Sequence, residues 1–340
     1  MKIAHEIIAL RTKNPFVISR GGESEYRVVR ITLTADDGTT GWGEAAPSKF
    51  YGETADTVVD VLPLMAPVLE KADGWSLEAI EHALTRAIRF NGSARAAVSA
   101  ALHDMLGKRL GAPVYKIWGL DQSAAPLTSF TIGIAPDEKT LRQRVKDAEQ
   151  YPVLKIKLGS SWDERIVRVV RELAPDKVLR VDANAAWTPK GALRLIPALK
   201  ELGVEFVEQP LPPQDIEGLR FIRERSALPI VADESCLVSS DIPKLSGAVD
   251  GINIKLAKCG GLREALRMIA TARAHDMLVM AGCMIESSLG ITAAAQFAPL
   301  LDCVDLDGAA LVANDPYVGA TIDGGVIRLP NRAGLGVEIR

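Results

Sequence analysis

The sequence lacks the features that define several classes of protein. It contains no run of Lys or Arg, and 40 basic against 43 acidic residues leave a net charge of −3. Nucleic-acid binding needs concentrated positive charge, so that class is excluded. No stretch of about 20 apolar residues is uninterrupted, so no membrane-spanning helix is expected. No apolar run follows a basic start at the N-terminus, so no secretory signal is expected.

Cysteine is scarce, and low-complexity segments are absent. The four cysteines, at 236, 259, 283 and 303, have spacings that fit neither a disulfide framework nor a zinc motif. A reducing, cytoplasmic location is therefore expected. Apolar residues make up 48% of the chain and recur periodically nearly throughout, which excludes disorder. A folded chain with a substantial core is expected.

The first 120 residues have the pattern of a small α+β unit. Tyr26–Ala35 alternates apolar and polar residues, a turn follows at Asp36-Asp37-Gly38, and Thr39–Glu44 continues the pattern. This arrangement predicts an antiparallel hairpin. Helical periodicity follows at 54–71, 77–90 and 94–110, and the last of these ends at Gly111-Ala112-Pro113.

From Thr128 onward, short apolar runs alternate with amphipathic stretches. Eight such runs lie at 129–134, 154–158, 178–182, 205–208, 230–233, 251–256, 278–281 and 304–307. Polar residues at the ends of four of them, at 157, 182, 208 and 233, are 25, 26 and 25 residues apart. That interval suits one strand, one helix and two loops.

Eight such units predict an α/β fold, a (β/α)₈ barrel over residues 121–310 with its active site at the carboxyl ends of the strands. An open doubly wound sheet is the alternative, but no glycine-rich phosphate turn follows Ile134. The Gly/Pro-rich segment 311–340 can return to the N-terminal unit.

Three consecutive predicted strands end in carboxylates: Asp182, Glu208 and Asp233. Neighbouring strand ends lie roughly 5 Å apart, so three acids there would repel one another. A hard divalent cation resolves the repulsion, and Mg²⁺ suits oxygen ligands. Any one of the acids could instead cap a helix or form an ion pair. Zinc is disfavoured because no His or Cys joins the group.

Three lysines accompany these acids. Lys155 and Lys157 point to one side of their strand, which is either the barrel interior or an outer, helix-facing row. Lys255 lies four strands further on, opposite them. Lysines on opposite sides could remove a proton from one face of a carbon and return it to the other, and nearby positive charge would lower their pKa values. A Schiff-base lysine or a structural ion pair are the alternatives for Lys255.

The last predicted strand ends in Asp305 and Asp307, which point to the same side. They lie too far around the rim to join the three acids. They could bind a cationic group such as a substrate ammonium. The alternative for Asp307 is turn formation before Gly308.

These residues together resemble the enolase superfamily, in the branch that includes muconate cycloisomerases. Gly41-Trp42-Gly43-Glu44 is similar to the signature of the capping domain, here residues 1–120. The barrel motifs are matched in order by 155–157, 182–184, 208–210, 233–235 and 253–255. The resemblance implies Mg²⁺ ligation by Asp182, Glu208 and Asp233. It also implies acid–base roles for Lys157 and Lys255, with Lys155 supporting the substrate carboxylate and enolate.

Within that branch, Asp305-Leu306-Asp307 resembles the signature of dipeptide epimerases, as does the segment 283–292. Arg20, after the Pro15-Phe16 pair, is similar to the arginine that meets the Glu side chain in L-Ala-D/L-Glu epimerases. The resemblance implies an isomerase that inverts the α-carbon of the C-terminal residue by 1,1-proton transfer through an enolate. A small dipeptide is the expected partner, and a homo-oligomer is compatible because family members often assemble.

Two other functions remain open at this point. One is a lyase on the same scaffold, either a muconate cycloisomerase or an o-succinylbenzoate synthase, which shares the enolate step. The other is a non-catalytic scaffold that binds a metal and an acidic ligand. The pair of opposed lysines argues against the second, because binding alone does not need two bases.

Overall fold

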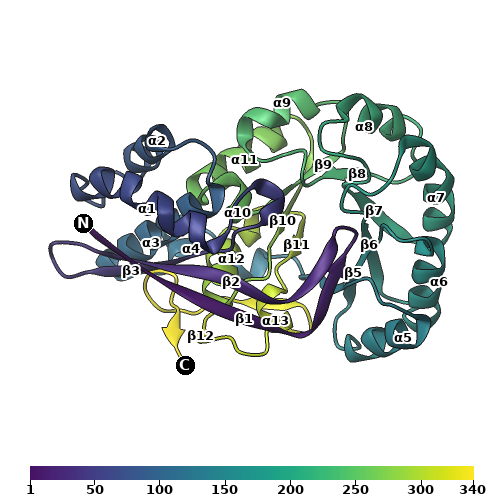
Figure 1. Cartoon of the computed structure of the whole chain (residues 1–340), viewed down its shortest axis with the longest axis horizontal. Coiled ribbons are helices and arrows are strands. Elements are labelled where there is room, and N and C mark those ends of the chain that lie inside the picture. Colours follow the sequence, from purple (N-terminus) through teal and green to yellow (C-terminus); the bar gives the residue numbers. More distant parts are fainter.

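The computed structural model describes residues 1–340 and begins with a three-stranded antiparallel sheet in the order β1-β2-β3 (Figure 1). The strands are β1 (Lys2–Ile18), β2 (Gly21–Thr34) and β3 (Thr40–Ala45). The β2–β3 hairpin confirms the predicted one. The long strand β1 was not predicted, because most of its side chains are exposed and no buried face imposes an alternating pattern.

Four helices follow this sheet: α1 (Ala55–Glu70), α2 (Leu77–Ala87), α3 (Gly92–Leu110) and α4 (Val114–Ile117). Helix α3 lies directly on β3, and two glycines permit the approach. A Cβ atom added at Gly41 or Gly43 would lie 1.9 Å from the carbonyl oxygen of Ala101 or Ala97, respectively. The Gly-Trp-Gly-Glu sequence therefore has a packing cause, since any side chain at either glycine would collide with the backbone of α3.

The second part of the chain is a barrel of eight parallel strands paired in sequence order. They are β4 (Phe130–Ile132), β5 (Val153–Lys157), β6 (Val178–Asp182), β7 (Val204–Glu208), β8 (Ile230–Ala232), β9 (Gly251–Ile254), β10 (Leu278–Gly282) and β11 (Cys303–Asp305). The Ser129 amide donates to the Val304 carbonyl at 3.0 Å, and Thr128 bridges Val304, which brings the two end strands together. The predicted (β/α)₈ barrel with an α+β cap is confirmed.

Helices between the strands cover the outside of the barrel, and α5 to α9 form its outer arc in Figure 1. They are α5 (Glu138–Asp147), α6 (Asp163–Leu173), α7 (Pro189–Glu201), α8 (Ile216–Arg223), α9 (Ile242–Leu245), α10 (Leu256–Cys259), α11 (Leu262–Ala274) and α12 (Ser288–Ala295), and the short helix α13 (Gly308–Leu311) follows the last strand. None of the helices is long and apolar enough to span a bilayer.

Apolar side chains pack into two main clusters. The larger holds 64 buried residues and joins the strands to the outer helices, and the other holds 20 buried residues between the N-terminal sheet and its helices. A small separate cluster of Phe206, Val231, Met280 and Cys303 comes from the barrel strands β7, β8, β10 and β11. The predicted site residues of the barrel lie toward its mouth, the face formed by the carboxyl ends of the strands, whereas Arg180 on β6 is buried against Phe206.

The C-terminal segment forms two short antiparallel pairs and contacts the N-terminal elements. Strand β12 (Tyr317–Val318) pairs with β15 (Glu338–Ile339), and β13 (Thr321–Asp323) pairs with β14 (Val326–Arg328). The Leu335 amide donates to the Asp104 carboxylate on α3 at 2.8 Å. The Arg11 amide on β1 donates to Asn314 at 2.7 Å.

The tip of the β1–β2 hairpin reaches across the barrel mouth, and Figure 1 shows it beside β5. The Ile134 amide after β4 donates to the Val17 carbonyl at 2.9 Å. The Ser19 hydroxyl donates to the Asn184 carbonyl beyond β6 at 3.1 Å. These bonds place the hairpin tip over the ends of the barrel strands.

Candidate active site

A cavity of about 720 Å³ lies between the barrel mouth and the N-terminal sheet. Its wall includes six of the nine site residues predicted from the sequence: Arg20, Lys157, Asp233, Lys255, Asp305 and Asp307. The other three, Lys155, Asp182 and Glu208, are buried behind that wall: Lys155 contacts Asp305, Asp182 contacts Lys157, and Glu208 contacts Lys155. The structure thus brings together residues that are spread over almost 290 positions of the sequence.

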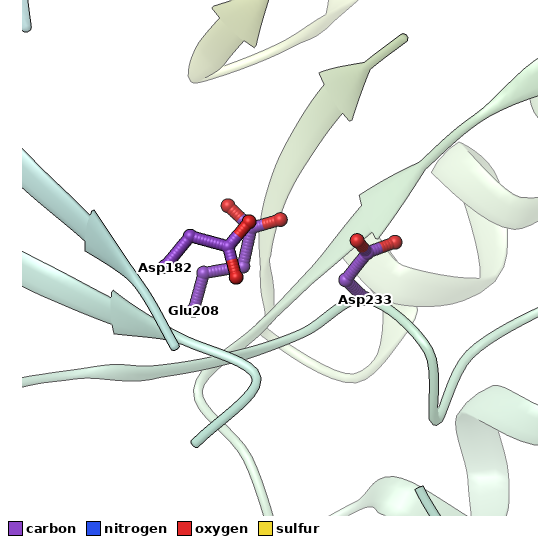
Figure 2. A group of neighbouring side chains, drawn as sticks. All are labelled: Asp182, Glu208 and Asp233. Atoms are coloured by element: carbon purple, nitrogen blue, oxygen red, sulfur yellow. The ribbon is translucent and has the colours of Figure 1, made fainter. Parts of the chain in front are cut away.

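The three predicted metal ligands lie close to one another (Figure 2). Asp182 ends β6, Glu208 ends β7, and Asp233 directly follows β8. One carboxylate oxygen from each lies within 4.8 Å of the others, and all three side chains are buried. Asn253 on β9 donates to Glu208 Oε1 at 2.7 Å and fixes that carboxylate. Three hard oxygen donors held this close, away from solvent, fit a magnesium ion.

Lys155 is the centre of a buried charge cluster. Its Nζ lies 2.7 Å from Glu208 Oε2, 2.8 Å from Asp305 Oδ2 and 3.3 Å from Asp182 Oδ2. Burial disfavours its charge, but Asp305, Glu208 and Asp182 outweigh that effect and raise the pKa of Lys155 well above its usual value. The inward-facing interpretation of this lysine is therefore confirmed, and the outer-row alternative is wrong.

Lys157 and Lys255 stand on β5 and just after β9, four strands apart around the barrel. Lys157 Nζ lies 2.6 Å from Asp182 Oδ2, and Lys255 Nζ lies 2.8 Å from Asp233 Oδ2. Burial and the positive charge of Lys155 act to lower the pKa of Lys255, but the paired carboxylate of Asp233 outweighs them and raises it.

Lys258 was not predicted from the sequence, although it is fully buried at the same corner. Its Nζ donates to Asp233 Oδ1 at 2.6 Å and to the Asn253 carbonyl at 2.9 Å. Burial alone would raise the pKa of Asp233, but Lys255 and Lys258 hold it well below its usual range. The sequence feature that could have indicated Lys258 is its spacing, because it follows Lys255 by about one helical turn at α10.

Asp305 and Asp307 lie together at the junction of β11 and β4. Asp305 accepts from the Ser129 hydroxyl at 2.6 Å, and Asp307 accepts from the Thr131 amide at 2.6 Å. Asp307 precedes α13 but makes no capping hydrogen bond to it, so turn formation does not explain this residue. Burial and the neighbouring Asp305 raise the pKa of Asp307 to about 7. Burial and the nearby negative charge of Asp305 both favour a cation beside Asp307.

Arg20, at the hairpin tip, contacts both the cap and the barrel. Its Nη1 lies 2.8 Å from Glu234 Oε1 and donates to the Asn184 carbonyl at 2.9 Å. The guanidinium also lies over the Phe50 ring, with 4.1 Å from its carbon to the ring centroid. The sequence indicated Arg20, but the contacts to Glu234 and Phe50 depend on the folded loop and were not predicted.

Comparison with known proteins is consistent with this architecture. Residues 138–340 match the family described as "Enolase C-terminal domain-like", and residues 2–119 match "Mandelate racemase / muconate lactonizing enzyme, N-terminal domain". The chain therefore belongs to the enolase superfamily, in the family of mandelate racemase and muconate lactonizing enzyme.

Individual relatives carry more specific names. The chain is 40% identical to an L-Ala-D/L-amino acid epimerase of Maribacter sp., covering 100% of this chain and 99% of that protein. It is 39% identical to an L-Ala-D/L-Glu epimerase of Bacteroides thetaiotaomicron, covering 99% and 88%. The dipeptide epimerase of Enterococcus faecalis, solved with Mg and L-Leu-L-Tyr, superposes with a TM-score of 0.94, 31% identity and 99% coverage of both chains.

Lys155→Met tests whether the central lysine holds the buried acids together. Without divalent cations, the variant should lose about 3–5 kcal/mol of unfolding free energy, because several carboxylates would remain buried without their partner. Urea titration measures this difference. Lys200→Met, at an exposed position of α7, is the control and should change stability little. Equal stabilities of the two variants would contradict the assigned role of Lys155.

Proposed function

We propose that this protein is a Mg²⁺-dependent dipeptide epimerase, which inverts the α-carbon of the C-terminal residue of its substrate. The observation that carries the proposal is the arrangement of one site: three converging acids, lysines on opposite sides, and a further pair of acids beside them. The names of the relatives support the same activity and extend to both acidic and apolar dipeptides.

Asp182, Glu208 and Asp233 would hold the magnesium ion. Bound there, Mg²⁺ supplies positive charge that binds the substrate carboxylate and stabilises the enolate formed by loss of the α-proton. Lys155, already in contact with two of these acids, adds a fixed positive charge at the same place. Its burial keeps that charge free of competing water.

Lys157 and Lys255 exchange the α-proton on opposite faces of the substrate. The uncharged amine of one lysine accepts the proton, and the ammonium of the other returns a proton to the opposite face. Lys255, whose charged form is favoured by Asp233, is suited to start as the donor. Epimerisation in the reverse direction exchanges the two roles.

Asp305 and Asp307 would bind the α-ammonium of the substrate. Asp305 already contacts Lys155 and Ser129. Asp307 is buried in the cavity wall and accepts a hydrogen bond from the Thr131 amide. A substrate cation there offsets the repulsion between the two acids. Arg20, a cation on the cap side of the cavity, would contact the side chain of the residue being inverted, with Glu as one candidate.

The proposal includes a division of the chain into a capping unit 1–120, a barrel 121–310 and a segment 311–340 that returns to the cap. The end of the N-terminal family match at residue 119 supports the first boundary, and the bond between Leu335 and Asp104 supports the return to the cap. The four cysteines are free thiols, which supports a reducing, cytoplasmic location.

Incubation with dipeptides in D₂O tests the activity. With Mg²⁺ present, L-Ala-L-Glu and a panel of L-Ala-L-Xaa dipeptides should exchange the α-hydrogen of the second residue, and the L,D-diastereomer should appear. Chelation with EDTA should abolish both changes, because the substrate carboxylate would lose its main counter-charge. NMR follows both signals. A panel in which no dipeptide shows Mg²⁺-dependent exchange would remove the proposed function.

Lys157→Ala and Lys255→Ala test the assignment of opposite faces. Each variant should lose epimerisation. One should still exchange the α-hydrogen of the L,L-dipeptide and the other that of the L,D-dipeptide, because each retains one base. The exposed Lys244→Ala on α9 is the control and should behave like the wild type. Undiminished epimerisation in either active-site variant would contradict the two-lysine mechanism.

A further inference from the structure

Only one nitrogen of the Arg20 guanidinium is bonded within the protein. Nη1 contacts both Glu234 Oε1 and the Asn184 carbonyl, and no hydrogen bond of Nε or Nη2 is present. The side chain is 32% exposed and lines the cavity, whereas that of Glu234 is 1% exposed. Arg20 is therefore anchored by a buried carboxylate while it keeps hydrogen-bond donors available to a ligand.

The barrel geometry places Arg20 at one end of the proposed substrate, and the inference rests on that proposed function. Asp305 and Asp307 lie where β11 meets β4, on the opposite side of the barrel from β7 and β8. A dipeptide with its ammonium there and its α-carbon between the two lysines extends its C-terminal residue toward the ends of β6 to β8. Arg20, bonded to residues that follow β6 and β8, lies at that end.

Other basic side chains of the cap that line the cavity are already paired. Lys49 Nζ lies 2.7 Å from Glu23, and Arg27 lies 2.8 Å from Asp56. A substrate with an acidic side chain therefore has Arg20 as its counter-charge, and it must share that guanidinium with Glu234. Two carboxylates on one guanidinium repel each other, which reduces the gain from binding the second.

We infer that Glu234 is a specificity-determining residue, which neutralises Arg20 and thereby lowers the preference of the site for acidic side chains. A neutral side chain leaves the Arg20–Glu234 ion pair intact. It can pack against the aromatic ring of Phe50, which already lies under the guanidinium. The cavity then accepts neutral and acidic C-terminal residues with similar efficiency, since discrimination depends on the difference between the two binding free energies.

Glu234→Gln separates charge from shape. The amide oxygen of Gln can still accept a hydrogen bond from Arg20 Nη1, but it does not neutralise the guanidinium. The measured quantity is the ratio of kcat/KM for L-Ala-L-Glu to that for L-Ala-L-Gln, two dipeptides of nearly equal shape. This ratio cancels any effect of the substitution on proton transfer that both substrates share. It should rise about tenfold over the wild type, mainly through KM for the acidic dipeptide.

Two further variants define the origin of the change. The double variant Arg20→Gln/Glu234→Gln should lose the increase, because no cation remains for the substrate carboxylate. Glu25→Gln removes the same charge from the exposed β2 part of the cavity wall, where the acid does not contact Arg20. Screening by solvent should keep its ratio within about twofold of the wild type.

Calorimetric dissociation constants for the same two dipeptides, with Mg²⁺ present, replace kcat/KM if Glu234→Gln turns over too slowly. An unchanged or lower ratio in Glu234→Gln would overturn the inference, and so would an equal increase in Glu25→Gln. Either result, with an active wild type, leaves the epimerase function standing. A wild type that neither binds nor exchanges these dipeptides would contradict the proposed function, and the specificity inference with it.

Discussion

Ion pairing between buried lysines and buried carboxylates at the barrel mouth is the interaction on which the site depends. Lys155 alone touches acids from β6, β7 and β11, so three strands share one positive charge. Burying such groups costs solvation free energy that only close opposite charges offset. The cluster is therefore a poor source of net stability. Its consequence is functional, because it holds charged groups in fixed positions where water would otherwise screen them.

Keeping water away from these buried charges also requires the cap to lie close to the barrel mouth. The hairpin tip bonds to the ends of β4 and β6 through Val17 and Ser19, and Arg20 adds an ion pair to the residue beside a proposed metal ligand. The cavity is thus bounded by charged groups of both parts. In the proposed complex, substrate side chains would meet residues of the cap, whereas the proposed proton transfer uses residues of the barrel. One barrel can therefore retain its reaction while the loops above it set which side chain is accepted.

Much of this organisation could be predicted because it is periodic. Repeats of about 25 residues, each with an apolar run and a polar end, identify the strands and place Asp182, Glu208 and Asp233 on one rim. Strand β1 could not be found in the same way, since its exposed side chains do not alternate. A return of the C-terminal segment to the N-terminal unit was an expectation from composition, but the bond partner Asp104 on α3 has no local sequence signal.

Pair contacts were the least predictable part of the site. Lys258 is separated from Lys255 by one turn, but its role arises from carbonyls and a carboxylate of two different strand ends. Glu234 follows a predicted ligand directly, yet its partner Arg20 is more than 200 residues away in the sequence. Such contacts follow from tertiary placement, which a single sequence specifies only through the fold. The opposed placement of Lys157 and Lys255, by contrast, followed from strand count alone.

The central claim is that a divalent cation lies among the three acids, between the two lysines. Anomalous diffraction from crystals of the protein prepared with Mn²⁺, which takes similar oxygen ligands, tests it most directly. The account predicts a strong anomalous peak bounded by the carboxylates of Asp182, Glu208 and Asp233. A map with no peak there, at a Mn²⁺ concentration that supports turnover, would contradict it.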